Sequence, residues 1–206
     1  MLFRSSCCGE SVRKAGNESL FQSLMRGNLA AFKESGVKEI IVTSPHCLTT
    51  FKEDYPGLIG ETRVLHVTQY LAQLVQEGKL PFKKDVPKRI VYHDPCYLGR
   101  HNGIYEEPRS VLASIPGVTL LDEVECRENT LCCGGGGGRI WMETLKGERF
   151  SDILVGQAAE MGADVLVTAC PYCLLNFKDS VVTLDVEASL EVKDVSEIVL
   201  EALGDA

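Results

Sequence analysis

The sequence predicts an α/β fold made of two duplicated units with parallel-rich sheets, of which the N-terminal unit is incomplete. Three observations predict it: short β-branched runs follow amphipathic helical stretches, the chain repeats itself at an offset of 125–126 residues, and cysteines recur at matching places. Short apolar runs of this kind are typical of buried parallel strands. A repeat this long indicates duplicated domains. We expect units over residues 1–80 and 88–206, joined by a linker over 78–88.

One amphipathic helix precedes a strand in each unit. Apolar residues spaced three and four apart lie along one stripe, as in a helix that packs on a core. A glycine follows each stripe, Gly36 in the first unit and Gly162 in the second, where a helix commonly ends in a left-handed residue. The stripes consist of Leu20, Phe21, Leu24, Met25, Leu29 and Phe32 in the first unit, and of Phe150, Ile153, Leu154, Ala158 and Met161 in the second.

The predicted strands are short and each leads directly into a cysteine-bearing segment. We expect strands over residues 40–43, 89–93 and 165–168, and helices over 65–78 and 195–203 that close the two units. Open α/β sheets bind ligands beyond the carboxyl ends of their strands. The sequence therefore predicts a ligand site at one end of the sheet.

The internal repeat covers three pairs of segments. Because a repeated sequence indicates a repeated fold, the same local structure is expected twice in the chain. The aligned pairs are Cys7-Cys8-Gly9 with Cys132-Cys133-Gly134, residues 36–52 with 162–178, and residues 65–69 with 190–194.

The composition is that of an ordinary globular protein and excludes several classes. The chain has 206 residues, 45% of them hydrophobic and 24% charged, with a net charge of −8. Scattered and outnumbered basic residues argue against nucleic acid as a partner. No apolar run reaches the ~20 residues that span a bilayer. Nine cysteines without an export signal indicate thiolate ligation in a reducing compartment. We expect a cytoplasmic protein that meets a membrane only through a partner.

Five cysteines of the second unit predict a metal site. Thiolates are soft donors that suit iron–sulfur clusters and zinc. A structural zinc site needs four ligands, so the fifth cysteine favours a cluster. The run Gly134–Gly138 lets the backbone approach a cluster closely and turn its amides toward cluster sulfides. The five candidate ligands are Cys96, Cys132, Cys133, Cys170 and Cys173.

Three segments of the second unit resemble the cysteine-rich CCG domain of heterodisulfide reductase-like and flavoprotein–quinone-linked iron–sulfur oxidoreductases. They are residues 93–100, 131–139 and 169–173. The resemblance implies that the five cysteines hold a noncubane 4Fe–4S cluster. It implies an oxidoreductase subunit or fragment that relays electrons, either toward disulfide reduction or in a flavoprotein- or quinone-linked chain. Implied partners are a ferredoxin-like or flavoprotein electron-transfer subunit and a membrane quinone-reducing subunit.

The first unit departs from this pattern. Ser44 stands where the second unit has Cys170, and the chain begins six residues before Cys7-Cys8, so a strand and a ligand are expected to be missing. We therefore expect no noncubane cluster here, and the chain is expected to be the C-terminal part of a longer design. The remaining alternatives are an empty site or a zinc ion on Cys7, Cys8 and Cys47, with His46 as a further ligand.

Two rival functions remain open from the residues. A zinc-stabilised structural or interaction module would need no redox activity. A thiol-redox enzyme would use Cys170 and Cys173 as a C-x-x-C pair. Outside the motif, Cys126 is expected to be a plain thiol. His93 is expected either to cap its strand or to orient a ligand, the structural role being favoured.

Overall fold

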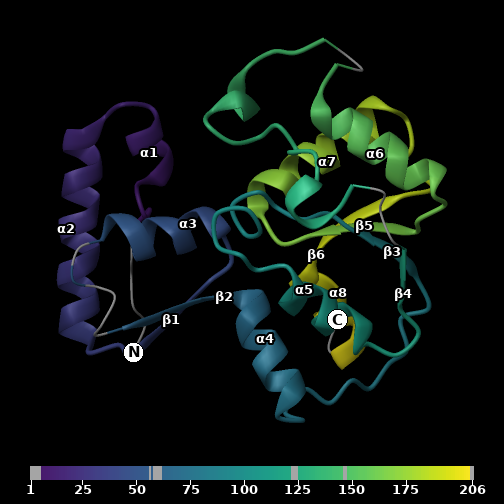
Figure 1. Ribbon diagram of the computed structural model, residues 1–206, viewed down its shortest axis with the longest axis horizontal. Helices are drawn as coiled ribbons and strands as arrows, with labels where there is room; N and C mark the ends of the chain where they lie inside the picture. Colours follow the sequence, from purple (N-terminus) through teal and green to yellow (C-terminus); the bar gives the residue numbers. More distant parts are fainter. Residues whose placement is uncertain (1–5, 56, 58–61, 122–124, 146–147, 205–206) are drawn as a thin grey trace. The chain divides into compact units, whose positions relative to one another are not determined.

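The structure is a computed structural model that describes residues 6–55, 57, 62–121, 125–145 and 148–204. The chain divides into two compact units, Met1–His66 and Val67–Ala206, called the first and second unit from here on. Each unit combines helices with parallel strands, which confirms the predicted α/β class (Figure 1). Within the described ranges, no helix is long and apolar enough to cross a bilayer.

The first unit contains a two-stranded parallel sheet in which Ile40 lies opposite Val64. Its long helix ends as predicted, because Gly36 follows it with a left-handed φ of 62°. The elements are α1 (Glu10–Lys14), α2 (Glu18–Ser35), β1 (Glu39–Val42), α3 (Pro45–Thr49), a π-helical turn (Thr50–Asp54) and β2 (Arg63–His66).

The buried stripe of α2 differs from the predicted one. Leu20 is 45% exposed, and the polar residue Asn28 takes a place in the stripe. The Asn28 side-chain amide donates to the Cys7 carbonyl at 3.1 Å and to the Tyr55 hydroxyl at 3.0 Å. A buried amide is tolerated when its donors are satisfied in this way. The buried residues of α2 are Phe21, Met25, Asn28 and Phe32.

The second unit is built on a four-stranded parallel sheet with the order β4-β3-β5-β6. The strand β5 is buried along its whole length, as expected for a strand covered on both faces. The elements are α4 (Val67–Gln76), β3 (Arg89–Tyr92), α5 (Glu106–Ala113), β4 (Thr119–Leu121), 3-10 turns (Arg127–Asn129 and Arg139–Trp141), α6 (Phe150–Glu160), β5 (Val165–Thr168), α7 (Pro171–Thr183), β6 (Glu191–Asp194) and α8 (Val195–Leu203).

Helices cover both faces of this sheet. The helix α6 packs against α7, while α5 packs against α4 and α8. Figure 1 shows α6 and α7 on one side of the sheet and α5 and α8 on the other. One apolar core cluster contains Leu166 and Phe177 together with Cys133, Cys170 and Cys173. Three of the candidate ligands therefore belong to the core of the unit.

The buried side of α6 is another departure from the predicted stripe. Phe150 and Ile153 are 49% and 42% exposed, whereas Ser151 and Asp152 are buried. The hydroxyl of Ser180 on α7 lies 2.6 Å from Asp152 Oδ1 and 2.8 Å from Ser151 Oγ. Apolar spacing alone does not indicate such a polar contact, because it depends on the residue of the facing helix.

Strands β2, β4 and β6 are absent from the predicted set. The strand β6 carries three charged residues at the edge of its sheet, and β4 has only three residues, none of them buried. The predicted helix over 65–78 begins at Val67, because Leu65 and His66 complete β2. This helix, α4, packs against α5 and α8 of the second unit rather than closing the first.

The predicted linker over 78–88 packs on the second unit. The backbone amides of Lys83 and Lys84 donate to the Ala202 carbonyl, and the Val86 amide donates to the Pro116 carbonyl. The backbone hydrogen bonds of this segment are thus made with α8 and with the loop before β4.

The structure confirms two of the three aligned repeat segments and corrects the third. Ser44 and Cys170 are both extended residues that cap a helix whose first residue is proline. The pairing of β1 with β2 and of β5 with β6 makes Leu65 equivalent to Lys193 rather than to Leu190. The second unit has two more residues between its paired strands, so the offset between the units rises from 126 to 128 there, whereas the sequence alignment used 125.

Candidate metal centre

The candidate site lies at the carboxyl ends of β3 and β5. The chain runs from β3 outward to β4 and then returns to β5 on the other side of β3, so the strand order reverses between β3 and β5. Ligands of open α/β sheets bind in the crevice at such a reversal. Cys96 follows β3 after three residues, and Cys170 follows β5 after one. The topology therefore brings these two cysteines to the same end of the sheet, as the sequence predicts.

The adjacent cysteines Cys132 and Cys133 reach the site through a tight turn. Gly134 has a φ of 81°, and its amide donates to Cys132 Sγ at 3.4 Å. The side-chain amide of Asn176 on α7 donates to the Cys133 carbonyl at 3.1 Å. At the first residue of the glycine run, a left-handed backbone thus turns an amide toward a cysteine sulfur, while the predicted approach of the run to a cluster stays a prediction.

The same turn occurs in the first unit. Gly9 has a φ of 86°, and its amide donates to Cys7 Sγ at 3.4 Å. Here the hydroxyl of Tyr55 donates to the Cys8 carbonyl at 2.9 Å. The duplicated sequence motif thus folds twice into one local structure.

All five candidate ligands form a continuous set of sulfur contacts. Cys132 Sγ lies 3.9 Å from Cys96 Sγ. Cys133 is hydrogen-bonded to both Cys132 and Cys173. Cys173 is in turn hydrogen-bonded to Cys170. The structure therefore brings together the five cysteines that the sequence singles out.

Mutual hydrogen bonding shifts the pKa values of these thiols in opposite directions. The pKa of Cys132 is lowered, because hydrogen bonds with Cys133 and Cys96 favour its thiolate. The pKa of Cys133 is raised to about 12, mainly by its bond with Cys132, and that of Cys96 is raised for the same reason. Thiols with a raised pKa keep their protons at neutral pH, so only some of the five sulfurs are anionic. A bound soft cation removes that limit, because coordination deprotonates a thiol.

Sequence reasoning missed a buried ion pair beside the site. Both carboxylate oxygens of Asp94 accept hydrogen bonds of 2.6 Å from the Arg109 guanidinium, and one also accepts the Arg127 amide at 2.7 Å. This pair holds the turn between β3 and Cys96. The available signal was an acidic residue directly after a buried apolar strand, where a carboxylate needs a cationic partner.

Arg100 supports the approach to the cysteine pair. Its guanidinium donates to the Thr130 carbonyl at 2.7 Å and to the Glu128 carbonyl at 3.3 Å. Its charge also favours the thiolate of Cys96. The residue therefore both positions the segment before Cys132 and supplies positive potential near the sulfurs.

His93 is fully buried among the same sulfurs. One of its ring nitrogens and the Sγ atoms of Cys133 and Cys173 all lie within 4.8 Å of one another. The ring stacks edge-on against Phe177 with centroids 4.9 Å apart. Burial lowers the pKa of His93 to about 4, so the imidazole is neutral at neutral pH.

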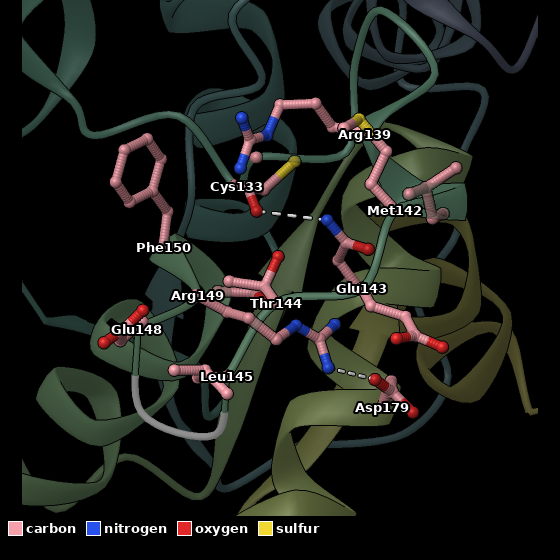
Figure 2. A pocket seen from close by; sticks show the side chains of 14 residues that line it. Cys133, Arg139, Met142, Glu143, Thr144, Leu145, Glu148, Arg149, Phe150 and Asp179 are labelled. Carbon is pink, nitrogen blue, oxygen red and sulfur yellow. Dashed lines mark hydrogen bonds and ion pairs between the residues drawn. The ribbon is translucent and has the colours of Figure 1, made fainter.

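A pocket of about 500 Å³ opens beside Cys133. Figure 2 shows Arg139 and Met142 above it and Leu145 and Glu148 below, with Arg149 paired to Asp179. Both signs of charge line this pocket, and Cys133 itself is only 3% exposed. The pocket therefore connects the protein surface with the region beside Cys133.

The candidate ligands of the first unit come together only in part. Cys8 Sγ and Cys47 Sγ lie 3.2 Å apart, while Cys7 is exposed. His46 Nδ1 lies 3.1 Å from a carboxylate oxygen of Glu10. Among the residues that the structure describes, only the group around His93 brings three metal-ligating side chains within 4.8 Å of one another.

Comparisons with known proteins agree on one family. The family model described as "CCG: Cysteine-rich domain" matches residues 1–52 and 90–178. The chain is 42% identical over 204 residues to "EtfAB:quinone oxidoreductase" of Syntrophomonas wolfei, covering 96% of this chain and 28% of that protein. It is 38% identical over 195 residues to "Probable iron-sulfur-binding oxidoreductase FadF" of Bacillus subtilis, covering 95% of this chain and 28% of that protein.

A third relative comes from Methanosarcina barkeri, where it is one subunit of the "Dihydromethanophenazine:CoB--CoM heterodisulfide reductase". The two sequences are 37% identical over 205 residues, which cover 96% of this chain and 49% of that relative. The chain thus spans between 28% and 49% of the length of these three relatives.

Proposed function

The chain belongs to the cysteine-rich CCG family, and on that premise we propose that it is the cluster-binding part of an iron–sulfur oxidoreductase that relays electrons. The proposed cofactor is a noncubane 4Fe–4S cluster held by Cys96, Cys132, Cys133, Cys170 and Cys173. Such a cluster supplies one-electron storage and transfer.

The observation that carries the proposal is the continuous contact of five buried or half-buried sulfurs at the strand-order reversal. Five soft donors in one set exceed the four that a structural zinc site takes. The donor set therefore fits an iron–sulfur cluster better than a structural ion.

The chain's own residues supply the surroundings that such a cofactor needs. The Gly134 amide donates to one ligand sulfur, and Arg100 places positive charge near another. Hydrogen bonds to ligand sulfur and nearby positive charge both stabilise the reduced, more negative state of a cluster. Packing of Cys133, Cys170 and Cys173 within the core excludes water from their thiols.

The dithiol alternative is less well supported. Cys170 and Cys173 are each 2% exposed, and hydrogen bonds with Cys133 and Cys170, together with burial, raise the pKa of Cys173 well above its usual value. A reactive C-x-x-C pair needs an accessible sulfur with a lowered pKa. These two thiols therefore fit ligation better than thiol–disulfide exchange.

Partners are proposed by class. The names of the relatives include a quinone oxidoreductase and a heterodisulfide reductase, and the chain spans less than half of each matched protein. We expect a ferredoxin-like or flavoprotein unit to exchange electrons with the cluster, and a quinone-linked partner to provide contact with a membrane. Relay is favoured over disulfide cleavage, because Ser44 stands in the first unit where the second unit has Cys170, so one of the five ligands is not repeated there.

The first unit carries a narrower proposal. Cys8 Sγ and Cys47 Sγ lie 3.2 Å apart, so these two cysteines are proposed as what remains of a ligand set. The prediction to test is a zinc ion bound by both of them and by Cys7. Zinc analysis of the Cys47→Ser variant decides it. Loss of one zinc per chain relative to the parent protein supports the site, and an unchanged zinc content rejects it.

Anaerobic purification with iron, sulfide and zinc analysis tests the main proposal. About four iron and four sulfide per chain, with visible charge-transfer absorbance, are expected for one cluster. The Cys96→Ser variant should lose most of both, whereas the matched control Cys126→Ser should keep them, since Cys126 lies outside the sulfur set. Zinc without sulfide in the parent protein would reject the redox function.

The type of cluster needs a separate measurement. Mössbauer and electron paramagnetic resonance spectra of the loaded protein distinguish a noncubane from a cubane 4Fe–4S arrangement. A cubane spectrum that persists in Cys96→Ser would leave an iron–sulfur protein but reject the five-cysteine ligand set.

A further inference from the structure

We infer that His93 is a positioning residue of the proposed cluster site, which donates one imidazole N–H to a sulfur atom there. The inference rests on the proposed function, since a metal group that replaces the thiol protons turns the neighbouring sulfurs from weak into strong acceptors for that N–H. It goes beyond the five-cysteine ligand set, because it gives a fixed task to a side chain that is not one of the ligands.

The first observation is that His93 is buried without a polar partner. Its side chain is 0% exposed, and neither Nδ1 nor Nε2 has a hydrogen-bond partner among the residues that the structure describes. A neutral imidazole always carries one N–H donor and one acceptor nitrogen. Buried polar groups in native proteins are almost always paired, so an orphaned histidine of this kind calls for an absent partner.

The second observation is the direction in which the ring is held. The His93 backbone amide donates to the Val167 carbonyl of β5 at 2.8 Å, and the ring packs edge-on against Phe177 at an interplanar angle of 85°. These contacts leave little rotational freedom. One ring nitrogen therefore stays near the Sγ atoms of Cys133 and Cys173, within the 4.8 Å that encloses the three ligand-capable atoms.

Two other buried side-chain oxygens at this end of the sheet resemble His93 in their hydrogen bonding. Tyr92 Oη and Thr168 Oγ1 have no hydrogen-bond partner among the described residues. They belong to the last residues of β3 and β5, the strands that lead into the cysteine segments. Orphaned polar atoms thus gather at the carboxyl ends of these two strands.

The sulfurs change their hydrogen-bonding character when a metal binds. The Cys173 thiol is hydrogen-bonded to Cys133 and Cys170, and the Cys133 thiol is hydrogen-bonded in turn to Cys132. Coordinated thiolates and bridging sulfides have no proton and act only as acceptors. The imidazole N–H of His93 then has a partner within reach, and the buried donor is satisfied.

A donated hydrogen bond at this place stabilises the reduced cluster. Added negative charge strengthens an N–H···S bond, so such bonds raise the reduction potential of iron–sulfur clusters. Removal of the donor should therefore lower the midpoint potential. We expect a change of about tenfold in the reduction equilibrium, which is about 59 mV for a one-electron couple.

The test compares variants of His93 in the anaerobically loaded protein. His93→Phe keeps a planar ring and removes both nitrogens, whereas His93→Asn and His93→Gln place an amide N–H near Nδ1 and Nε2 respectively. His101→Phe is the matched control, because His101 is exposed and stacks on Tyr97 outside the sulfur set. The readouts are iron and sulfide per chain and the midpoint potential by redox titration.

The expected result is a lowered potential in His93→Phe, with at least partial recovery in either the Asn or the Gln variant, and no change in His101→Phe. Recovery in one of the two amide variants identifies which nitrogen donates. Equal potentials in the parent protein and His93→Phe, at equal cluster content, would overturn the inference while leaving the proposed function intact.

A measurement on the parent protein covers the case in which a variant does not fold. Pulsed electron paramagnetic resonance of protein labelled with nitrogen-15 histidine reports the coupling of an imidazole nitrogen to the paramagnetic cluster. A weak coupling supports the hydrogen bond, whereas a strong coupling of a directly bound nitrogen, or none, overturns it. Parent protein that holds neither iron nor sulfide would reject the proposed function and this inference together.

Discussion

Alanine substitutions in the run Gly134–Gly138 show which glycines are needed for their backbone conformation. Gly134 has a φ of 81°, and a Cβ placed there meets its nearest atom, on Phe150, at an ordinary contact distance of 3.6 Å. Gly136 has no positive φ and has nothing within 4 Å of such a Cβ. Both substitutions therefore add one methyl group without a clash, and they differ only in backbone conformation.

The expected effects have opposite signs. An alanine in the left-handed region costs about 1–2 kcal/mol, so Gly134→Ala should lower the free energy of unfolding by that amount. At a compatible backbone, glycine to alanine stabilises by about 0.4–1 kcal/mol, because the unfolded chain loses freedom. The two variants should thus differ by about 1.5–3 kcal/mol in stability.

A third variant of the run tests a steric effect alone. A Cβ at Gly135 lies 2.8 Å from Nδ2 of Asn176, the amide that donates to the Cys133 carbonyl. Gly135→Ala should therefore break this hydrogen bond and release the Cys133 carbonyl, although its backbone is not strained. Iron content should fall in this variant and in Gly134→Ala, and it should stay unchanged in Gly136→Ala.

The assay is denaturant unfolding of the metal-free protein under reducing, anaerobic conditions, followed by circular dichroism. The slope with denaturant should be the same in all variants, so that midpoint shifts report stability. Equal midpoints for Gly134→Ala and Gly136→Ala would refute the reasoning, since they would mean that the turn does not require a left-handed residue.

Two further predictions concern charge. Burial lowers the pKa of His93 to about 4, so between pH 6.5 and 4 the unfolded state binds a proton that the folded state does not. Metal-free protein should lose about 3 kcal/mol of stability as pH falls through that window, relative to His93→Phe measured alongside; parallel pH profiles would contradict this. Asp94→Asn leaves the Arg109 guanidinium uncompensated and should cost about 3–5 kcal/mol in thermal unfolding. Asp164→Asn, at an exposed pair with Arg89, should cost much less, and equal losses would show that burial of the Asp94 pair is unimportant.

The sequence predicted correctly those structures that depend on a residue and its neighbours in the chain. Gly36 and Gly162 end helices as predicted, because a left-handed residue after a helix is a property of glycine itself. The strands around residues 40–43, 89–93 and 165–168 appear within a residue of their predicted bounds. The runs of β3 and β5 are buried, so burial and sequence agree there, whereas Ile41 of β1 is 40% exposed.

Elements that depend on contacts with distant parts of the chain were not predicted from the sequence pattern. The strand β6 is a charged edge strand that exists because β5 offers it backbone partners. The buried polar face of α6 depends on Ser180 of the facing helix. In both cases the stabilising contact lies far away in the chain, so the periodicity of the segment itself carries no sign of it.

The sequence by itself determined the candidate ligand set, because Cys96, the C-C-G pair and the C-x-x-C pair of the second unit are five thiolate donors that are identified without coordinates. Only the tertiary structure decided that these sulfurs touch one another, since contact depends on the strand-order reversal between β3 and β5. It alone also decided the place of His93. Burial is a property of packed layers, and a histidine at a strand end becomes an orphaned donor only when the fold closes over it.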